Sequence, residues 1–300
     1  MLTYLLAPFA NHPDVSPVAG LFLACLAVII LGVSKSGFGG GVGILAVPLF
    51  ALALGPKDGT ALLLPFLLAA DIFSVFHHWG TWDVQILKVM APGTLAGIAI
   101  GSVSLYLLVH LPGPEAGATQ ASTQTAVKVK SVRDQSDDAL NLLTGVICIG
   151  YIGLDQIRKR YAPNWHFKPN YQTGTAAGMA VGTVSTISHA AGPIAAIFLL
   201  GQNLPHKTFM GTTVIYFFAI NSIKLLPFSV IGMYNLQQLQ QAPWFLLLLV
   251  PVGTFLGAHL NRKISEPAFR MVIMWLVFLS GIDLITSTFG YNILSLFRRA

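Results

Sequence analysis

Charged side chains are scarce in this sequence. Of its 300 residues only 9% are Asp, Glu, Lys or Arg, whereas 54% are hydrophobic. A soluble domain carries about 25% charged residues. The scarcity excludes an ordinary soluble protein and predicts one that lies in a lipid bilayer. We expect no nucleic-acid partner despite the net charge of +6, because the aromatic residues lie in apolar runs and not among basic ones.

Cysteine and the common catalytic motifs are also nearly absent. Cys25 and Cys148 each lie within an apolar run, and neither has the CxxC or Cys/His spacing of a metal or redox site. The sequence contains no HExxH, GxSxG or Walker motif, which would indicate a metalloprotease, a hydrolase or a nucleotide-driven pump. We therefore expect no enzyme, no cofactor and no metal, which leaves a secondary transporter or a channel.

Long apolar runs are what the sequence has in abundance. Several exceed the roughly 20 residues that cross the hydrocarbon core of a bilayer. The runs at 41–55 and 190–202 are short, and whether they cross fully is left open. We predict an all-α integral membrane protein with about eight transmembrane segments. The apolar runs lie near 15–34, 41–55, 60–78, 86–110, 140–157, 174–187, 190–202, 207–232, 243–261 and 268–289.

Two small, polar, helix-breaking stretches interrupt these runs. Residues 31–43 read LGVSKSGFGGGVG, and residues 182–193 read GTVSTISHAAGP. Lipid cannot hydrogen-bond a broken backbone, so such breaks persist only inside protein or against a water-filled cavity. Paired breaks in the two halves of a membrane protein point to a transport site.

The two halves of the chain also match each other in a preserved order. This order predicts an internal duplication, in which each repeat opens with a broken helix or hairpin. The matched positions are Ser34 with Ser185, Gly41 with Gly192, Asp71 with Asn221, the GTxxG motif at 93–97 with that at 253–257, and the Gly-x-Asp motif at 153–155 with that at 281–283.

The duplication divides the chain into two transmembrane repeats. We assign residues 1–157 to the first, 158–172 to an inter-repeat loop and 173–300 to the second. Residues 112–138 form a polar loop insertion within the first repeat. A hairpin followed by three crossings makes the repeats inverted. Counting Lys and Arg then places the side with Lys88, Lys207 and Arg262 in the cytoplasm of a multi-pass inner (cell) membrane protein.

The first break carries candidate substrate-binding residues. Its glycines allow close approach of a ligand to the backbone, and a helix starting near Gly41 would direct its N–H groups at an anion. Lys35 adds a positive charge, which at membrane depth needs a partner or a water-filled cavity. Two alternatives stay open: Lys35 extends to an interface, or the glycines serve close helix packing. The candidates are Ser34, Lys35, Gly37, Gly39, Gly40 and Gly41.

The second break repeats the arrangement without the lysine. Pro193 suits the first turn of a following helix, so an anion-facing helix N-terminus recurs. His189 either changes charge near neutral pH or is a satisfied structural residue. The candidates are Ser185, Ser188, His189, Ala191 and Gly192.

Three polar residues lie within otherwise apolar helices. Asn221 and Lys224 share one helix face through their i, i+3 spacing. Asp71 matches Asn221 in the other repeat, and we expect Asp71 to pair with Lys224 across the pseudo-symmetry axis. Such a pair is either structural or part of a coupling-ion path, and for proton coupling the candidates are Asp71 and His189.

The Gly-rich first break, the Ser-rich second break that ends AAGP and the helix with Asn-x-x-Lys together resemble the TauE/SafE family of sulfite and organosulfonate exporters. The resemblance covers roughly 15–289. It implies a two-repeat permease for small sulfur-containing anions. It also implies that the family's two breaks and its lysine correspond to residues of this chain. The matching positions are Gly37, Gly39, Gly40, Gly41, Ser188, His189, Ala191, Gly192, Pro193 and Lys224.

We therefore expect a secondary transporter, an exporter of sulfite, sulfoacetate or a related organosulfonate. The anion would lie between the two breaks, with Lys35 or Lys224 supplying the positive charge and Asn221 a neutral donor. The alternatives are a permease or channel for a different small solute, and a nontransporting membrane assembly protein. The expected partners are the small anion and the lipid bilayer. Whether the protein also forms a homodimer is left open.

Overall fold

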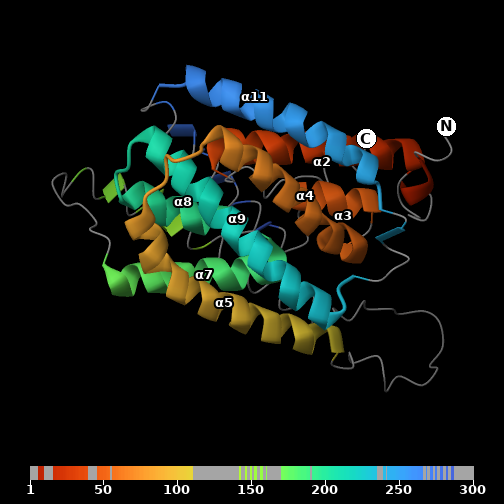
Figure 1. The fold of residues 1–300 in the computed structure, drawn as a ribbon, viewed down its shortest axis with the longest axis horizontal. Helices are drawn as coiled ribbons and strands as arrows, with labels where there is room; N and C mark the ends of the chain where they lie inside the picture. Colours follow the sequence, from red (N-terminus) through yellow and green to blue (C-terminus); the bar gives the residue numbers. More distant parts are fainter. Residues whose placement is uncertain are drawn as a thin grey trace.

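The regular elements of the described residues are all helices in the computed structural model (Figure 1). The structure describes residues 6–9, 16–39, 46–54, 56–110, 170–189, 191–234, 239–240 and 242–265, together with scattered positions within 142–160 and 268–286. The predicted site residues Gly40 and Gly41 and the predicted insertion at 112–138 lie outside the described residues.

Within the described part of the chain, four helices are long and apolar enough to cross a membrane, at Pro17–Phe38, Val84–Leu107, His206–Ile231 and Trp244–Lys263. They make the chain a multi-pass membrane protein, and shorter apolar helices accompany them. The elements are η1 (Ala7–Phe9), α2 (Pro17–Phe38), α3 (Ala46–Leu54), α4 (Pro56–His77), α5 (Val84–His110), α7 (Tyr171–Ser188), α8 (Gly192–Gly201), α9 (His206–Ile231), η4 (Trp244–Leu249) and α11 (Val250–Lys263).

The helices α3 and α8 follow the two breaks and are short. They have 9 and 10 residues, which is about 14–15 Å of helix. A bilayer core is roughly 30 Å thick, so neither helix crosses it alone.

Local sequence explains why α2 and α7 begin and end where they do. Ser16 caps α2 with its hydroxyl, and Asn170 caps α7 through a capping box with Thr173. At the other end α2 stops at Gly39 (φ 60°) and α7 stops at His189 (φ 56°), both left-handed. Both helices therefore end inside the predicted breaks.

Close helix packing holds the bundle together. In Figure 1, α11 lies along α2 and α7 lies along α5, with α4 and α9 between these two pairs. The GTxxG motif at 93–97 packs against the backbone of α7, and the one at 253–257 packs against the backbone of α2. Helices in lipid associate through such small-residue contacts because the lipid tails are as apolar as the side chains.

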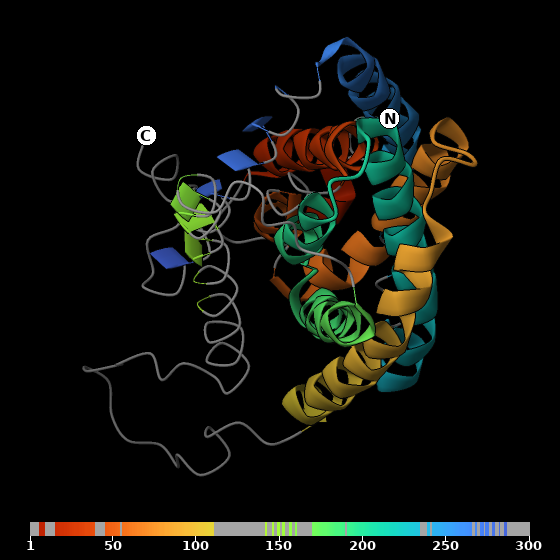
Figure 2. The same ribbon diagram turned by 90° about the vertical axis from the view of Figure 1, so that its left-hand side faces the viewer.

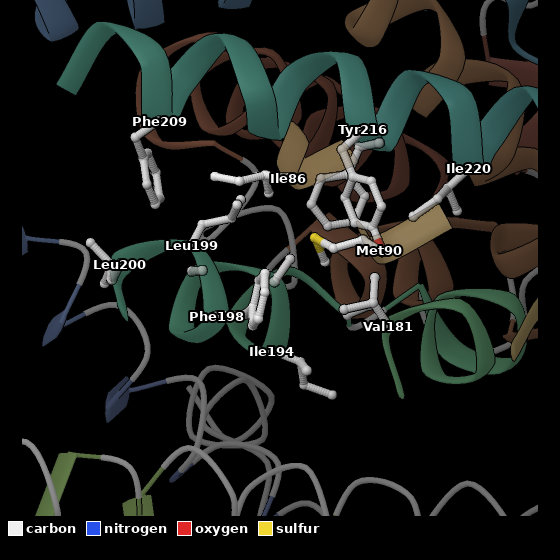
Figure 3. Packing of buried hydrophobic residues seen from close by; sticks show 14 of the residues in the cluster. Ile86, Met90, Val181, Ile194, Phe198, Leu199, Leu200, Phe209, Tyr216 and Ile220 are labelled. Atoms are coloured by element: carbon white, nitrogen blue, oxygen red, sulfur yellow. The ribbon is translucent and has the colours of Figure 1, made fainter. Parts of the chain in front are cut away.

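The two larger of three apolar clusters among the described residues border the pocket described below. One joins α5, α7, α8 and α9 around residues such as Met90, Leu199 and Tyr216 (Figure 3). The other joins α2, α3, α4 and η4 around Phe50 and Phe66. The view in Figure 2 looks at the bundle from the side and shows α8 within the bundle, with α5 and α9 on its outside. Large apolar side chains on the outside, such as those of α9 and α11, suit contact with lipid.

Replacing Gly178 with Ala is expected to destabilise the protein. An added Cβ would collide with the carbonyl oxygen of Met90 on α5, and overpacking of this kind costs about 1–3 kcal/mol. The measurement is unfolding of the purified protein in detergent. The matched control is Gly153→Ala, where an added Cβ meets nothing within 4 Å and Ala is the better helix former. Equal stability of the two variants would contradict the close approach of α5 and α7.

Candidate functional site

A pocket of about 380 Å³, including its opening, lies where the two apolar clusters meet. Both breaks contribute to it, since Lys35 comes from the end of α2 and Gly192 from the start of α8. The pocket is lined by Lys35, Val47, Leu63, Leu67, Ser185, His189, Gly192, Phe217 and Asn221.

Lys35 forms a buried ion pair on the α4 side of the pocket. Its Nζ lies 2.8 Å from Oδ1 of Asp71, and only 4% of Lys35 is exposed. The ammonium also lies over the ring of Phe217, 4.6 Å from the centroid, a distance at which a cation is attracted to the ring. Lys35 therefore does not extend to a membrane interface, and that alternative is wrong.

Asp71 is held by two partners, and neither is the predicted one. Besides Lys35, Nδ2 of Asn221 donates a hydrogen bond to Asp71 Oδ2. The expected Asp71–Lys224 ion pair is absent, because Lys35 occupies the ion-pair position on Asp71 and Lys224 points at the end of α7. The matched positions Asp71 and Asn221 thus contact each other directly.

Lys224 is fully buried and lies behind the pocket. Its Nζ donates to the carbonyl oxygen of Ser185 at 2.8 Å and to the hydroxyl of Ser185 at 3.0 Å. A third contact, at 3.1 Å, joins Nζ to Nδ1 of His189. Three acceptors match the three N–H bonds of an ammonium. A cation at this carbonyl also suits the negative end of α7.

His189 adopts a backbone conformation that an L-residue rarely takes. Its φ of 56° is left-handed, which costs about 1–2 kcal/mol without glycine. The contacts of the side chain explain why a histidine occupies this position. Its Nδ1 accepts a hydrogen bond from Lys224, and its ring packs edge-on against Phe228. When Nδ1 accepts, the proton of a neutral imidazole lies on Nε2. His189, which lines the pocket, therefore carries an N–H donor.

The N-terminus of α8 carries no side-chain cap at Ala191. Its first N–H groups have no partner within the helix, and Gly192 lines the pocket. Ser188, in contrast, does not line the pocket. Its hydroxyl donates to the carbonyl of Val184 within α7.

Gly37 and Gly39 serve packing and a turn. A Cβ on Gly37 would meet the backbone of Gly257 on α11, and Gly39 ends α2 with a left-handed φ against Thr213. The packing alternative is therefore confirmed for Gly37. Ser34 is buried, and its hydroxyl has no hydrogen-bond partner among the described residues.

The structure thus brings together only part of the predicted set. The predicted residues that line the pocket are Lys35, Ser185, His189, Gly192 and Asn221, and those that are described but do not line it are Ser34, Gly37, Gly39, Asp71, Ser188, Ala191 and Lys224.

Sequence reasoning missed the apolar wall of the pocket. Val47, Leu63, Leu67 and Phe217 form this wall, and each belongs to an ordinary apolar run. Nothing in the local pattern separates a residue that faces a pocket from one that faces its neighbours in the core.

A second polar cluster, also missed, surrounds the end of α2. The ring Nε2–H of His78 donates to the carbonyl of Ser36 at 3.0 Å, and Nδ2 of Asn261 donates to the carbonyl of Gly37 at 2.8 Å. Asn261 also contacts Nε2 of His206 at 2.7 Å. His78 is buried, and burial lowers its pKa, so the neutral ring is favoured. These side chains satisfy carbonyls that the helix end leaves without partners.

The contacts of this cluster gather several helix ends at one end of the bundle. The end of α11 meets the start of α9 through Asn261 and His206, and the start of α5 meets α9 through the backbone N–H of Asp83 and the hydroxyl of Thr212. The exposed cations near these helix ends are Lys88, Lys207, Arg262 and Lys263. These cations therefore lie at one end of the bundle, as the charge count expects, and the cytoplasmic side stays a prediction.

Comparison with known proteins identifies one family. The family model described as Sulfite exporter TauE/SafE matches residues 24–284. No curated protein matches the chain. No solved structure matches it either.

The ion pair between Lys35 and Asp71 is expected to contribute to stability. Lys35→Met leaves a buried carboxylate without its cation, which costs about 3–5 kcal/mol. Lys35→Met combined with Asp71→Asn is expected to lose less than the sum of the two single variants, as measured by unfolding in detergent. Lys207→Met, at the exposed start of α9, is the control. Additive losses would contradict direct coupling of Lys35 and Asp71.

Proposed function

We propose that this chain, which belongs to the TauE/SafE family of sulfite exporters, is a secondary transporter that exports a small sulfur-containing anion across the inner cell membrane. Sulfite and organosulfonates such as sulfoacetate are the proposed substrates. Family membership supports transport of a sulfite-related anion, and the charges around the pocket support an anion as the cargo.

The observation that carries the proposal is a buried lysine beside the pocket that has no carboxylate partner among the described residues. Lys35 is neutralised by Asp71. Lys224 is fully buried, and its hydrogen bonds go to the neutral acceptors Ser185 and His189. Among the described residues no carboxylate lies within ion-pair distance of Lys224. A buried ammonium without a counter-ion is costly, so an anion in the adjacent pocket favours the charged form of Lys224 and is attracted by it.

The pocket also offers donors for the oxygens of such an anion. Ser185, His189 and Asn221 line it together with the start of α8. Donors held in place before the ligand arrives favour a charged oxygen more strongly than mobile water does. In this arrangement Lys224 acts through Ser185 and His189 and does not touch the anion itself.

We further propose that the two repeats are inverted and that transport proceeds by rocking one repeat against the other. Three observations support this proposal. The matched residues Asp71 and Asn221 contact each other, as residues next to a two-fold axis do. The C-cap N–H groups of α2 and α7 bond to the carbonyls of the matched residues Ser34 and Ser185. The pairing of α5 with α7 corresponds to that of α11 with α2.

Proton coupling is the remaining part of the proposal. Apart from its two lysines, the site contains two side chains that we propose as proton carriers, Asp71 and His189. An anion that approaches Lys35 competes with Asp71 for the ammonium, which favours a proton on Asp71. Anion and proton would then bind together.

Flux of sulfite and sulfoacetate into proteoliposomes, with and without an imposed pH gradient, tests the function. We expect flux of at least one of the two anions and acceleration by the gradient. Flux that ignores the gradient would remove proton coupling and leave a uniporter. Absence of flux of both anions, in protein shown to be folded, would overturn the substrate assignment.

Lys224→Ala is expected to abolish flux, because it removes the charge that attracts the anion and the cation that holds Ser185 and His189. The variant is expected to keep its fold, as judged by a single symmetric peak in gel filtration. Lys207→Ala, an exposed lysine at the start of the same helix, is the matched control and should transport normally. Normal flux through Lys224→Ala would remove this lysine from the mechanism.

A further inference from the structure

We infer that His206 and Asn261 form a pH-sensitive latch, which holds the start of α9 against the end of α2 while His206 is neutral and releases it when His206 gains a proton. The inference rests on the proposed function, because it adds a residue through which protonation opens a path to the pocket. Three features carry it: the place of the latch, the direction of its hydrogen bonds and the charges around it.

The latch lies beside a closed contact between α2 and α9, next to the pocket. Lys35 lines the pocket, and α2 ends four residues later at its cap, Gly39. A Cβ on Gly39 would meet Thr213 and Phe209 of α9, and these two residues are 0% and 2% exposed. The contact of Gly39 with Phe209 and Thr213, which we call the seam, is therefore closed to water.

One amide group ties the two sides of the seam together. Nδ2 of Asn261 donates to the carbonyl of Gly37 on α2 at 2.8 Å and contacts Nε2 of His206, the first residue of α9, at 2.7 Å. Asn261 itself belongs to α11, which also packs on α2 through Gly37 and Gly257. Loss of the contact with His206 would therefore release α9 and leave α11 on α2.

The directions of these hydrogen bonds require a neutral His206. The carbonyl of Gly37 only accepts, so the amide nitrogen of Asn261, and not its oxygen, faces both partners. An amide nitrogen only donates, so Nε2 of His206 accepts. A second proton on the ring would place an N–H on Nε2, against an N–H of Asn261. Turning the amide over would satisfy His206 but would place its oxygen against the carbonyl of Gly37.

The neighbouring His78 lacks this property. Its Nε2 donates to the carbonyl of Ser36 at 3.0 Å, and a second proton on this ring would lie on Nδ1 and leave the bond in place. Burial lowers the pKa of His78, and its neighbours His77, His206 and Arg262 lower it further. Of the two histidines that take part in this cluster of hydrogen bonds, His206 is therefore the one whose protonation opposes the closed arrangement.

The charges around His206 also oppose its protonation. Among the described residues, the acidic side chain at these helix ends is Asp83, and it accepts from the backbone N–H groups of Gln85 and Ile86. The other charged or titratable groups on the helix ends that meet here are basic: His77, His78, Lys88, Lys207, Arg262 and Lys263.

The closed arrangement thus binds fewer protons at His206 than an open one, in which the ring leaves Asn261 and meets water. A state that binds fewer protons is favoured at higher pH and loses that advantage as the pH falls. Imidazoles change charge between about pH 8 and about pH 5. The latch is therefore closed at the upper end of this range and opens toward the lower end.

The accessibility of a cysteine in the seam tests the latch. Thr213→Cys is introduced into the full chain together with Cys25→Ser and Cys148→Ser, since the hydroxyl of Thr213 bonds only within α9. Its reaction with a water-soluble methanethiosulfonate is timed from about pH 8 to about pH 5. Val84→Cys, at a position that is 50% exposed at the start of α5, gives the reference rate that corrects for the pH dependence of the thiol.

We expect the ratio of the two rates to rise by about tenfold or more as the pH falls, which is the shift that one lost hydrogen bond with an unsatisfied donor produces. His206→Gln provides a neutral acceptor and should keep the ratio low at every pH. His206→Lys provides a permanent positive charge and should keep the ratio high at every pH.

Two control variants separate the latch from general effects of charge. His78→Gln keeps a donor for the carbonyl of Ser36 and should keep the pH dependence. His77→Lys adds a positive charge at an exposed position of the same end and should leave the ratio low at about pH 8. Each variant is checked by gel filtration. Hydrogen exchange of residues 206–213 in the unaltered chain, corrected for pH, decides the question where a variant fails to fold.

The outcomes separate this inference from the proposed function. A ratio that ignores pH, or that rises equally in His206→Gln, would overturn the latch. Sulfite exchange in proteoliposomes by that same protein would leave the proposed function intact. A ratio that rises as the pH falls, and only while His206 is present, supports the latch. The same rise in protein that exchanges neither sulfite nor sulfoacetate would keep the latch and overturn the substrate assignment.

Discussion

A charge buried in a membrane has to be compensated by the protein, because lipid offers neither water nor counter-ions. In this protein the contact between Lys35 and Asp71 meets that requirement, and Asn221 completes the coordination of the carboxylate. The contact joins α2, α4 and α9 at the level of the first break. The position of the pocket follows from this contact, because the two residues that bind Asp71, Lys35 and Asn221, both line the pocket.

The small residues make this contact geometrically possible. Glycines of the two GTxxG motifs let α5 approach α7 and α11 approach α2 until backbone meets backbone. The ends of α2 and α7 are thereby anchored on separate partner helices. At the end of α2, Asn261 and His78 take up the carbonyls that the break exposes. The end of α2 is therefore held by α11 and by His78, and the end of α7 is held by α5.

The second buried lysine, Lys224, is the feature that favours an anion as the ligand of the pocket. Lys224 is satisfied by Ser185 and His189 in number of hydrogen bonds but not in charge. His189 holds this arrangement in a left-handed conformation that glycine would adopt at lower cost. A residue kept at such a position despite its backbone cost is commonly found at functional sites. The pocket thus has a polar side, behind which Lys224 lies, and an apolar wall on the other side.

The sequence by itself determined the membrane class, the ends of α2 and α7 within the two breaks and the polar residues that had to be buried. These features are local, because a run of apolar residues and a Gly or Ser cluster act within a few turns of the chain. Only the tertiary structure decided which charges pair. Asp71 had two lysines to choose from, and the approach of α2 to α4 gave it Lys35 instead of Lys224. The apolar wall was likewise decided by packing, since Leu63 facing a pocket and a leucine facing the core look the same along the chain.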